Sequence, residues 1–126
     1  MSDGLTISGE LDELSTELGA LATEIYTLEE ELKEIDEQRD DHFNDLLTAL
    51  YYEYEADEKR RLPGEDVRNA LVIHQMRQEE PLLFGQHRRK HKELDRLERK
   101  ARRLEKRISS KQSQLSYLKT EAMATQ

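Results

Sequence analysis

Two runs of apolar residues with alternating three- and four-residue spacing constrain this chain more than any other feature. The first run lies near the N-terminus and comprises Leu11, Leu14, Leu18, Leu21, Ile25, Leu28, Leu32 and Ile35. The second lies near the C-terminus and comprises Leu94, Leu97, Ala101, Leu104, Ile108, Lys111, Leu115 and Leu118. This is the spacing of the a and d positions of a heptad repeat, so each run predicts a long helix with one narrow apolar seam.

Local signals predict where these helices begin and end. Ser8 is expected to be the N-cap of the first helix, because its hydroxyl oxygen can accept a hydrogen bond from a free backbone N–H of the first turn. The next seam positions after the first run are Arg39 and His42, so the seam fails there, while a more aromatic apolar pattern carries the helix on to about residue 58. Pro63-Gly64 then breaks the chain.

A short amphipathic helix is expected after this break. Its apolar side carries Val67, Ala70, Leu71, Ile73, His74 and Met76. Pro81 is predicted to end or kink this helix, and 82–85 (Leu-Leu-Phe-Gly) to form an apolar joint before the second long helix.

The two seams each span 25 residues, so we expect them to pack antiparallel with Leu11 beside Leu118. This register pairs the layers Leu14 with Leu115, Leu21 with Ile108, Ile25 with Leu104, Leu28 with Ala101, Leu32 with Leu97 and Ile35 with Leu94. It also places Arg39 opposite Lys90, His42 opposite His87, Glu24 near Arg107 and Glu31 near Lys100. The last two pairs favour this register electrostatically, and Lys111 is expected to help fix it, because a charge at a seam position penalises wrong pairings.

The predicted fold is all-α: an antiparallel coiled-coil helical hairpin with a small helical head at its closed end. We expect one domain over 1–126, with an acidic coiled-coil helix at 8–42, the head at 43–85 and a basic coiled-coil helix at 86–121. Pairing of the seams between chains would make identical contacts, so the sequence leaves both arrangements open. A two-helix hairpin buries little apolar area for the residues it orders, and we therefore expect a homo-oligomer.

Charge is distributed unequally along the chain. The net charge is −8, but residues 1–58 carry −17 and residues 59–126 carry +9. Cysteine is absent, which excludes disulfides and thiolate chemistry. No apolar run approaches the roughly 20 residues of a membrane span, and the start lacks the pattern of a signal peptide. We therefore expect a cytoplasmic protein with no membrane partner.

The basic residues of the second long helix give the sequence its main functional direction. Eight of them fall on the b, c and f positions, which face away from the partner helix: Arg88, Arg89, Lys92, Arg96, Arg99, Arg102, Arg103 and Lys106. Such a row predicts contacts with the phosphates of single- or double-stranded nucleic acid. The alternative is a solvated face that balances the acidic helix.

Aromatic and histidine residues of the head region offer further candidate sites. Tyr51, Tyr52 and Tyr54 are candidates for binding a partner, and the alternative is that they form the head's own core with Phe43 and Phe84. His87 and His91 have the spacing of two metal ligands on one helix face, but the cations between them would repel a metal ion, so we expect a structural role.

Catalytic and cofactor motifs are missing from the sequence. It contains no Gly-rich phosphate loop and no nucleophile elbow, and a two-helix hairpin offers no concave pocket. We expect no enzymatic activity, no metal, no cofactor and no small-molecule substrate.

Residues 108–119 (ISSKQSQLSYLK) resemble the closing helix of small coiled-coil proteins encoded by bacteriophages, and 51–56 (YYEYEA) before a charged Pro-Gly linker is similar in character. Some of these proteins are accessories to DNA replication and recombination, including mediators that load a recombinase on single-stranded DNA. The resemblance implies a phage-encoded protein acting in the host cytoplasm.

Together these features predict a non-enzymatic accessory or adaptor protein that contacts nucleic acid through the outward basic residues. The alternative is a protein-interaction module, either a scaffold, an assembly factor or an inhibitor of a host protein, that uses its acidic helix or its tyrosines.

Overall fold

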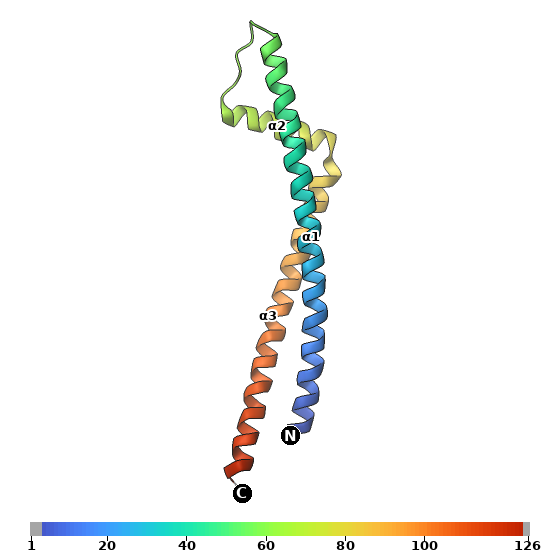
Figure 1. Cartoon of the computed structure of the whole chain (residues 1–126), viewed down its shortest axis with the longest axis vertical. Coiled ribbons are helices and arrows are strands. Elements are labelled where there is room, and N and C mark those ends of the chain that lie inside the picture. The colour runs from blue at the N-terminus through green and yellow to red at the C-terminus, as the bar shows by residue number, and fades with distance from the viewer. Residues whose placement is uncertain (1–3, 125–126) are drawn as a thin grey trace. The chain divides into compact units, whose positions relative to one another are not determined.

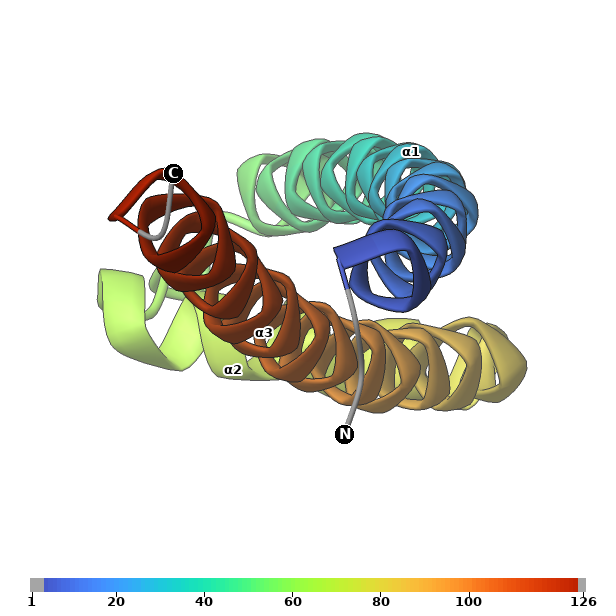
Figure 2. The same ribbon diagram turned by 90° about the horizontal axis from the view of Figure 1, so that it is seen from below.

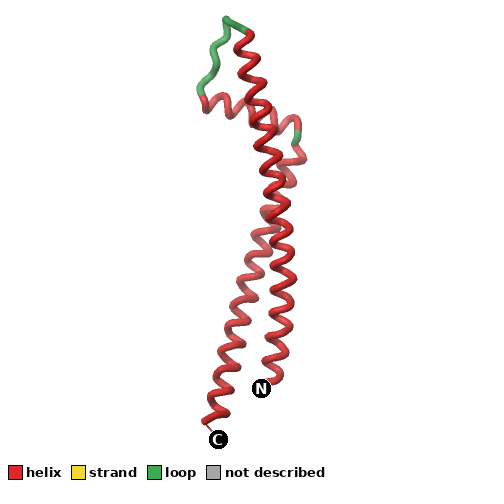
Figure 3. The backbone as a smooth tube through the Cα atoms, in the orientation of Figure 1, coloured by secondary structure: helices red, strands yellow, loops and turns green. Residues whose placement is uncertain are grey.

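A computed structural model describes residues 4–124, and nearly all of these lie in three helices (Figures 1 and 3). Helix α1 spans Gly4–Ala56, α2 spans Glu65–Glu79 and α3 spans Pro81–Ala124. There is no strand between residues 4 and 124. The predicted all-α fold class is confirmed.

Both long helices begin earlier than the sequence predicts. Helix α1 starts at Gly4, so Ser8 lies inside the helix and is not its N-cap. Helix α3 starts at Pro81, so 82–85 belong to its first turns and do not form a joint. Proline is compatible with the first position of a helix, because the N–H that it lacks would have no acceptor within the helix there.

The predicted break at Pro63-Gly64 is confirmed, since residues 57–64 lie outside the helices. Gly64 is the N-cap residue of α2 and has extended backbone angles, φ −62° and ψ 163°. Glu65 and Asp66 follow in the first turn, where the helix dipole favours carboxylates. Only Glu80 separates α2 from α3, and its backbone N–H donates to the Met76 carbonyl at 2.9 Å.

Helices α1 and α3 each contribute to two compact units. Among the described residues, unit 1 comprises 4–29 of α1 and 92–124 of α3. Unit 2 comprises 30–91, which includes the rest of α1, all of α2 and the start of α3.

In unit 1 the two helical segments lie side by side and run in opposite directions (Figures 1 and 2). Leu14 and Leu21 of α1 are buried with Leu97 and Leu104 of α3. The partly buried residues that pack against them are Leu18, Ile25, Leu28, Ala101 and Ile108. The core of unit 1 is therefore built from the two predicted seams.

The register within unit 1 differs from the prediction by about one heptad. Lys111 Nζ lies 2.6 Å from a carboxylate oxygen of Glu10, whereas the predicted register places Lys111 opposite Leu18. A Cβ atom built on Gly4 would lie 3.8 Å from Leu115 Cδ1, whereas Leu115 was expected to pair with Leu14. The predicted register, with Leu11 beside Leu118, is wrong.

The prediction chose the wrong register because the heptad pattern repeats every seven residues. Moving one helix by seven residues returns a and d positions to a and d positions, so the apolar pattern alone fits both registers. The observed register gives Lys111 a carboxylate partner and uses Ile7, which is only 2% exposed and precedes the run on which the prediction was based. The outward positions of α3 are the same in both registers.

Unit 2 has its own small core and a set of charged contacts between helices. Leu32 and Ile35 of α1 and Val72 and Met76 of α2 are its buried residues. Between α1 and α2, His42 Nε2 lies 2.6 Å from Glu79 Oε2. Between α1 and α3, His87 Nε2 lies 2.9 Å from Asp36 Oδ1, and Lys90 forms an ion pair with Glu31.

These contacts correct the predicted pairing of Arg39 with Lys90 and of His42 with His87. Both predicted pairs bring cationic or titratable side chains of the same kind together, whereas in the structure Lys90 and both histidines contact carboxylates. The Arg39 guanidinium instead lies 4.5 Å from the centre of the Phe84 ring. The predicted pairing of Glu31 with Lys100 is also wrong, because Glu31 binds Lys90.

Candidate nucleic-acid interface

The outward side of α3 in unit 1 carries six exposed cations, which we call the basic face: Lys92, Arg96, Arg99, Arg102, Arg103 and Lys106. Lys92, Arg99 and Lys106 are seven residues apart and lie along one line of the helix. The buried residues Leu97 and Leu104 repeat with the same spacing on the opposite side. The basic face extends for about 21 Å along the helix, from the rise of about 1.5 Å per residue.

Most of these cations have no ion-pair partner among residues 4–124. Arg96 is the exception, because its Nε and Nη2 donate to the Glu93 carboxylate at 3.0 and 2.5 Å. This hydrogen-bonded pair lowers the pKa of Glu93 and raises that of Arg96. Arg99 Nε donates to the Asp95 carbonyl at 3.3 Å. The other four side chains make no hydrogen bond or ion pair with any residue between 4 and 124.

Arg88 and Arg89, the other two predicted phosphate contacts, are exposed on the part of α3 that belongs to unit 2. Their neighbours in sequence, His87 and Lys90, are the residues that contact α1 there. All eight predicted cations are therefore exposed, and of these Arg96 also interacts electrostatically with Glu24 of α1.

The remaining basic residues of α3 in unit 1 lie elsewhere. Lys111 forms an ion pair with Glu10 and is half-buried. Arg107 and Lys100 form no ion pair with residues in the described part of the chain, so the predicted contact of Arg107 with Glu24 is also absent. Lys100 and Arg107 lie on the flank of the seam, whereas Lys111 occupies a seam position, and none of the three belongs to the basic face.

Unit 1 is strongly polarised between its two helices. Its α1 segment, 4–29, contains six acidic residues and no basic one, whereas its α3 segment, 92–124, contains ten basic and five acidic residues. An incoming polyanion is therefore attracted to the α3 side and repelled from the α1 side.

The predicted aromatic sites are dispersed rather than packed together. Arg60 lies over the Tyr54 ring at 4.4 Å and Arg68 over the Tyr51 ring at 5.4 Å. Tyr52 is 67% exposed. Phe43 and Phe84 are half-buried, and the buried residues of unit 2 are aliphatic, so the expectation that these rings form the core is wrong.

The histidine pair does not assemble a metal site. The rings of His87 and His91 meet edge to face with centroids 4.5 Å apart, and Nε2 of His87 faces Asp36. Within residues 4–124 there is no group of three or more side chains that could hold a metal ion.

Tyr117 is a further candidate residue of this interface that was not predicted from the sequence. It is 68% exposed and lies eleven residues, or about three helical turns, beyond Lys106, so it continues the line of Arg99 and Lys106. Ser110 and Ser113 are exposed between them. The signal was present in the three- and four-residue spacing from Lys106 through Ser110 and Ser113 to Tyr117, which lies beyond the last cation of the basic face.

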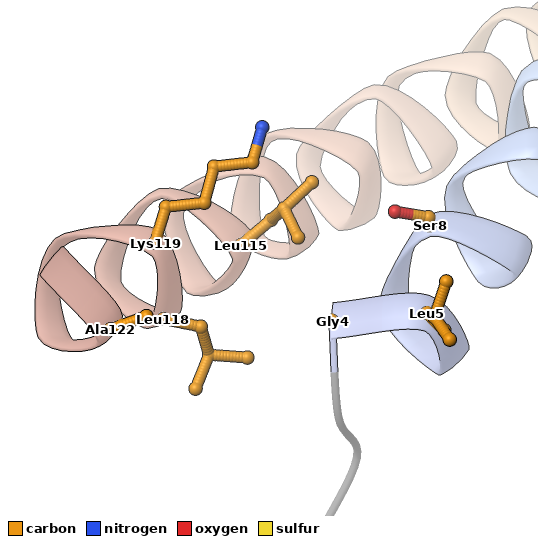
Figure 4. A pocket seen from close by; sticks show the side chains of 7 residues that line it. All are labelled: Gly4, Leu5, Ser8, Leu115, Leu118, Lys119 and Ala122. Carbon is orange, nitrogen blue, oxygen red and sulfur yellow. The ribbon is translucent and has the colours of Figure 1, made fainter. Parts of the chain in front are cut away.

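An open apolar groove of about 570 Å³ lies at the end of unit 1 (Figure 4). It is lined by Gly4, Leu5 and Ser8 of α1 and by Leu115, Leu118, Lys119 and Ala122 of α3. The groove contains no convergent set of polar groups of the kind that orients a substrate.

Comparisons with known proteins give no relative for this chain. No protein-family model, no curated protein and no solved structure matches it. Among the described helices, none is long and apolar enough to cross a membrane.

Proposed function

We propose that this chain is a non-enzymatic accessory protein that binds the phosphate backbone of nucleic acid through the basic face of α3. The observation that carries the proposal is the presence of six exposed cations on one side of one helix, four of them without any partner in the described chain. A free guanidinium or ammonium group can neutralise a phosphate and release condensed counterions without first breaking an internal ion pair.

We further propose that the chain forms an antiparallel coiled-coil hairpin with a helical head and assembles into homo-oligomers. We propose that it acts in the cytoplasm as a phage-encoded accessory of DNA replication or recombination. Oligomerisation would place several basic faces on one polyanion, so that weak individual contacts combine into higher apparent affinity.

The test compares two triple variants that remove the same charge from different sides of α3. Arg99→Gln, Arg102→Gln and Arg103→Gln remove half of the basic face. Lys100→Gln, Arg107→Gln and Lys119→Gln remove three cations outside it. Binding of labelled single- and double-stranded DNA is measured across a salt series that starts at about 50 mM, where phosphate contacts are strong.

The first triple variant should weaken binding and reduce the slope of log affinity against log salt by about 2 to 3, at about 0.7–0.9 per lost phosphate contact. The control triple should leave the slope close to that of the wild type. Equal losses in both variants would show that net charge, not the basic face, governs binding. Absence of binding by the wild-type protein at the lowest salt would remove the proposal.

A second candidate function is favoured by exposed apolar residues in unit 2. Tyr52 is 67% exposed, and Val67 and Leu71 lie exposed one turn apart on α2. Exposed apolar side chains of this kind can bind a protein partner, as expected if this chain is a scaffold, an assembly factor or an inhibitor. In that case the Arg99, Arg102 and Arg103 variant would retain function, whereas Tyr52→Ala with Leu71→Ala would lose it.

A further inference from the structure

Tyr117 extends the basic face into a region without charge. The outward line of α3 passes from Lys106 through Ser110 and Ser113 to Tyr117, a distance of about 16 Å along the helix. The Ser113 hydroxyl donates to the Ser109 carbonyl at 3.1 Å, so this stretch presents small neutral side chains. An extended polyanion held by Arg99 and Lys106 can therefore continue along the same line towards the tyrosine ring.

The ring of Tyr117 does not contribute to the packing of unit 1. An aromatic ring that serves the packing of unit 1 would point towards Leu115 and Leu118, which line the seam and the terminal groove. Tyr117 instead is 68% exposed and is absent from the residues that pack in the core of unit 1. Its ring is free to stack on another planar group.

A nucleobase that is not paired is the planar group that best fits this arrangement. Base–aromatic stacking tolerates any sequence and is the usual complement to a basic track in proteins that bind single strands. In a duplex the bases are already stacked on each other, and a tyrosine beside the backbone gains little from them. The cations alone do not discriminate between the two forms of nucleic acid.

We infer that Tyr117 stacks on an unpaired base of a single-stranded nucleic acid whose phosphates lie along the basic face. This inference rests on the proposed function and adds to it a preference for single strands and a base-contacting residue.

The experiment measures binding of a labelled oligothymidylate and of a labelled duplex of the same length to the full chain. The variants are Tyr117→Ala, which removes the ring, and Tyr117→Phe, which keeps the ring and removes only the hydroxyl. Tyr26→Ala is the matched control, because Tyr26 is 63% exposed in unit 1 but lies on the acidic helix α1. Helical circular dichroism verifies that each variant is folded.

Tyr117→Ala should weaken oligothymidylate binding by about five- to tenfold, near the lower end of measured stacking contributions. It should change duplex binding less than twofold and leave the salt slope unchanged, since no charge is lost. Tyr117→Phe and Tyr26→Ala should bind like the wild type.

The possible failures separate the two proposals. Wild-type-like oligothymidylate binding by Tyr117→Ala, equal losses for single strand and duplex, or a Phe variant as weak as the Ala variant would each overturn the stacking role. The proposed function would still stand in these cases if the basic-face triple variant reduced the salt slope. Absence of any nucleic-acid binding by the wild-type protein would overturn both.

Discussion

At the scale of single residues, a few polar side chains next to the seam determine how its apolar residues pair. Lys111 occupies a seam position, where a charge is unfavourable unless an opposite charge lies close by. In the predicted register its neighbour is Leu18, whereas in the structure it is Glu10 at 2.6 Å. The apolar seam residues fit both registers equally well. The ion pair of Lys111 with Glu10 favours the observed register.

The contact of His42 with Glu79 leads to a prediction about pH. The hydrogen bond to His42, with a further one from Gln75, lowers the pKa of Glu79 below its ordinary value of 4.5. A carboxyl group with a lowered pKa in the folded state stabilises the fold above its unfolded pKa, and this contribution is lost as the pH falls through the folded value. Glu79→Gln should therefore lower the melting temperature at pH 7.

The difference between Glu79→Gln and the wild type should shrink as the pH falls below about 4.5 and disappear at lower pH. Thermal unfolding followed by circular dichroism from pH 7 to pH 3 measures this. Glu80→Gln is the control, because the Glu80 side chain makes no ion pair with the described residues. A deficit of Glu79→Gln that stays constant over the whole range would contradict the assignment to the carboxylate.

At the scale of elements, α1 contains glycines that its own unit does not require. A Cβ atom built on Gly9 or Gly19 would meet nothing within 4 Å, and neither residue has positive φ. Glycine inside a helix is less favourable than alanine, because the unfolded chain loses more freedom when it orders. Gly9→Ala and Gly19→Ala should each raise the free energy of unfolding by about 0.5–1 kcal/mol.

Urea unfolding of dilute protein measures these gains. Gly64→Ala is the useful contrast: it also meets open space, but it replaces the N-cap residue of α2, where alanine is a poor substitute. A loss of stability for Gly19→Ala would mean that another molecule packs closely against this side of α1 in solution.

Periodicity made the helices predictable, but it left their ends and their register open. The break at Pro63-Gly64 followed from backbone chemistry. The start at Gly4 was missed because Ser8 resembles a good cap, and the start at Pro81 was missed because proline can end one helix and also begin the next. The register was missed because seven-residue steps are equivalent for the apolar pattern.

The basic face was predictable for the same reason that the register was not. The outward direction of Arg99 or Arg103 depends only on its position relative to Leu97 and Leu104, and a shift of one heptad does not change it. Tyr117 was not predicted because it lies eleven residues beyond Lys106, the last cation of the basic face, although the helix predicted over 86–121 contains it.

For the molecule as a whole, crosslinking tests whether the two seams of unit 1 meet within one chain in solution. The same residue contacts form if α1 of one chain pairs with α3 of another. The protein contains no cysteine, so a pair of introduced thiols can report the contact without background. Glu10 and Lys111 are suitable positions, because their charged atoms lie 2.6 Å apart.

A short bifunctional thiol reagent should join Glu10→Cys to Lys111→Cys within one chain at high dilution, giving a band of monomer mass with altered mobility on a denaturing gel. Glu17→Cys with Lys111→Cys is the matched control. It moves one thiol by one heptad, about 10 Å along α1, and should react poorly. Efficient joining of the control pair instead would restore the register predicted from equal seam lengths. A covalent dimer from the first pair at every dilution would show that the seams meet between chains, so that each two-helix unit, with its basic face, is shared by two molecules.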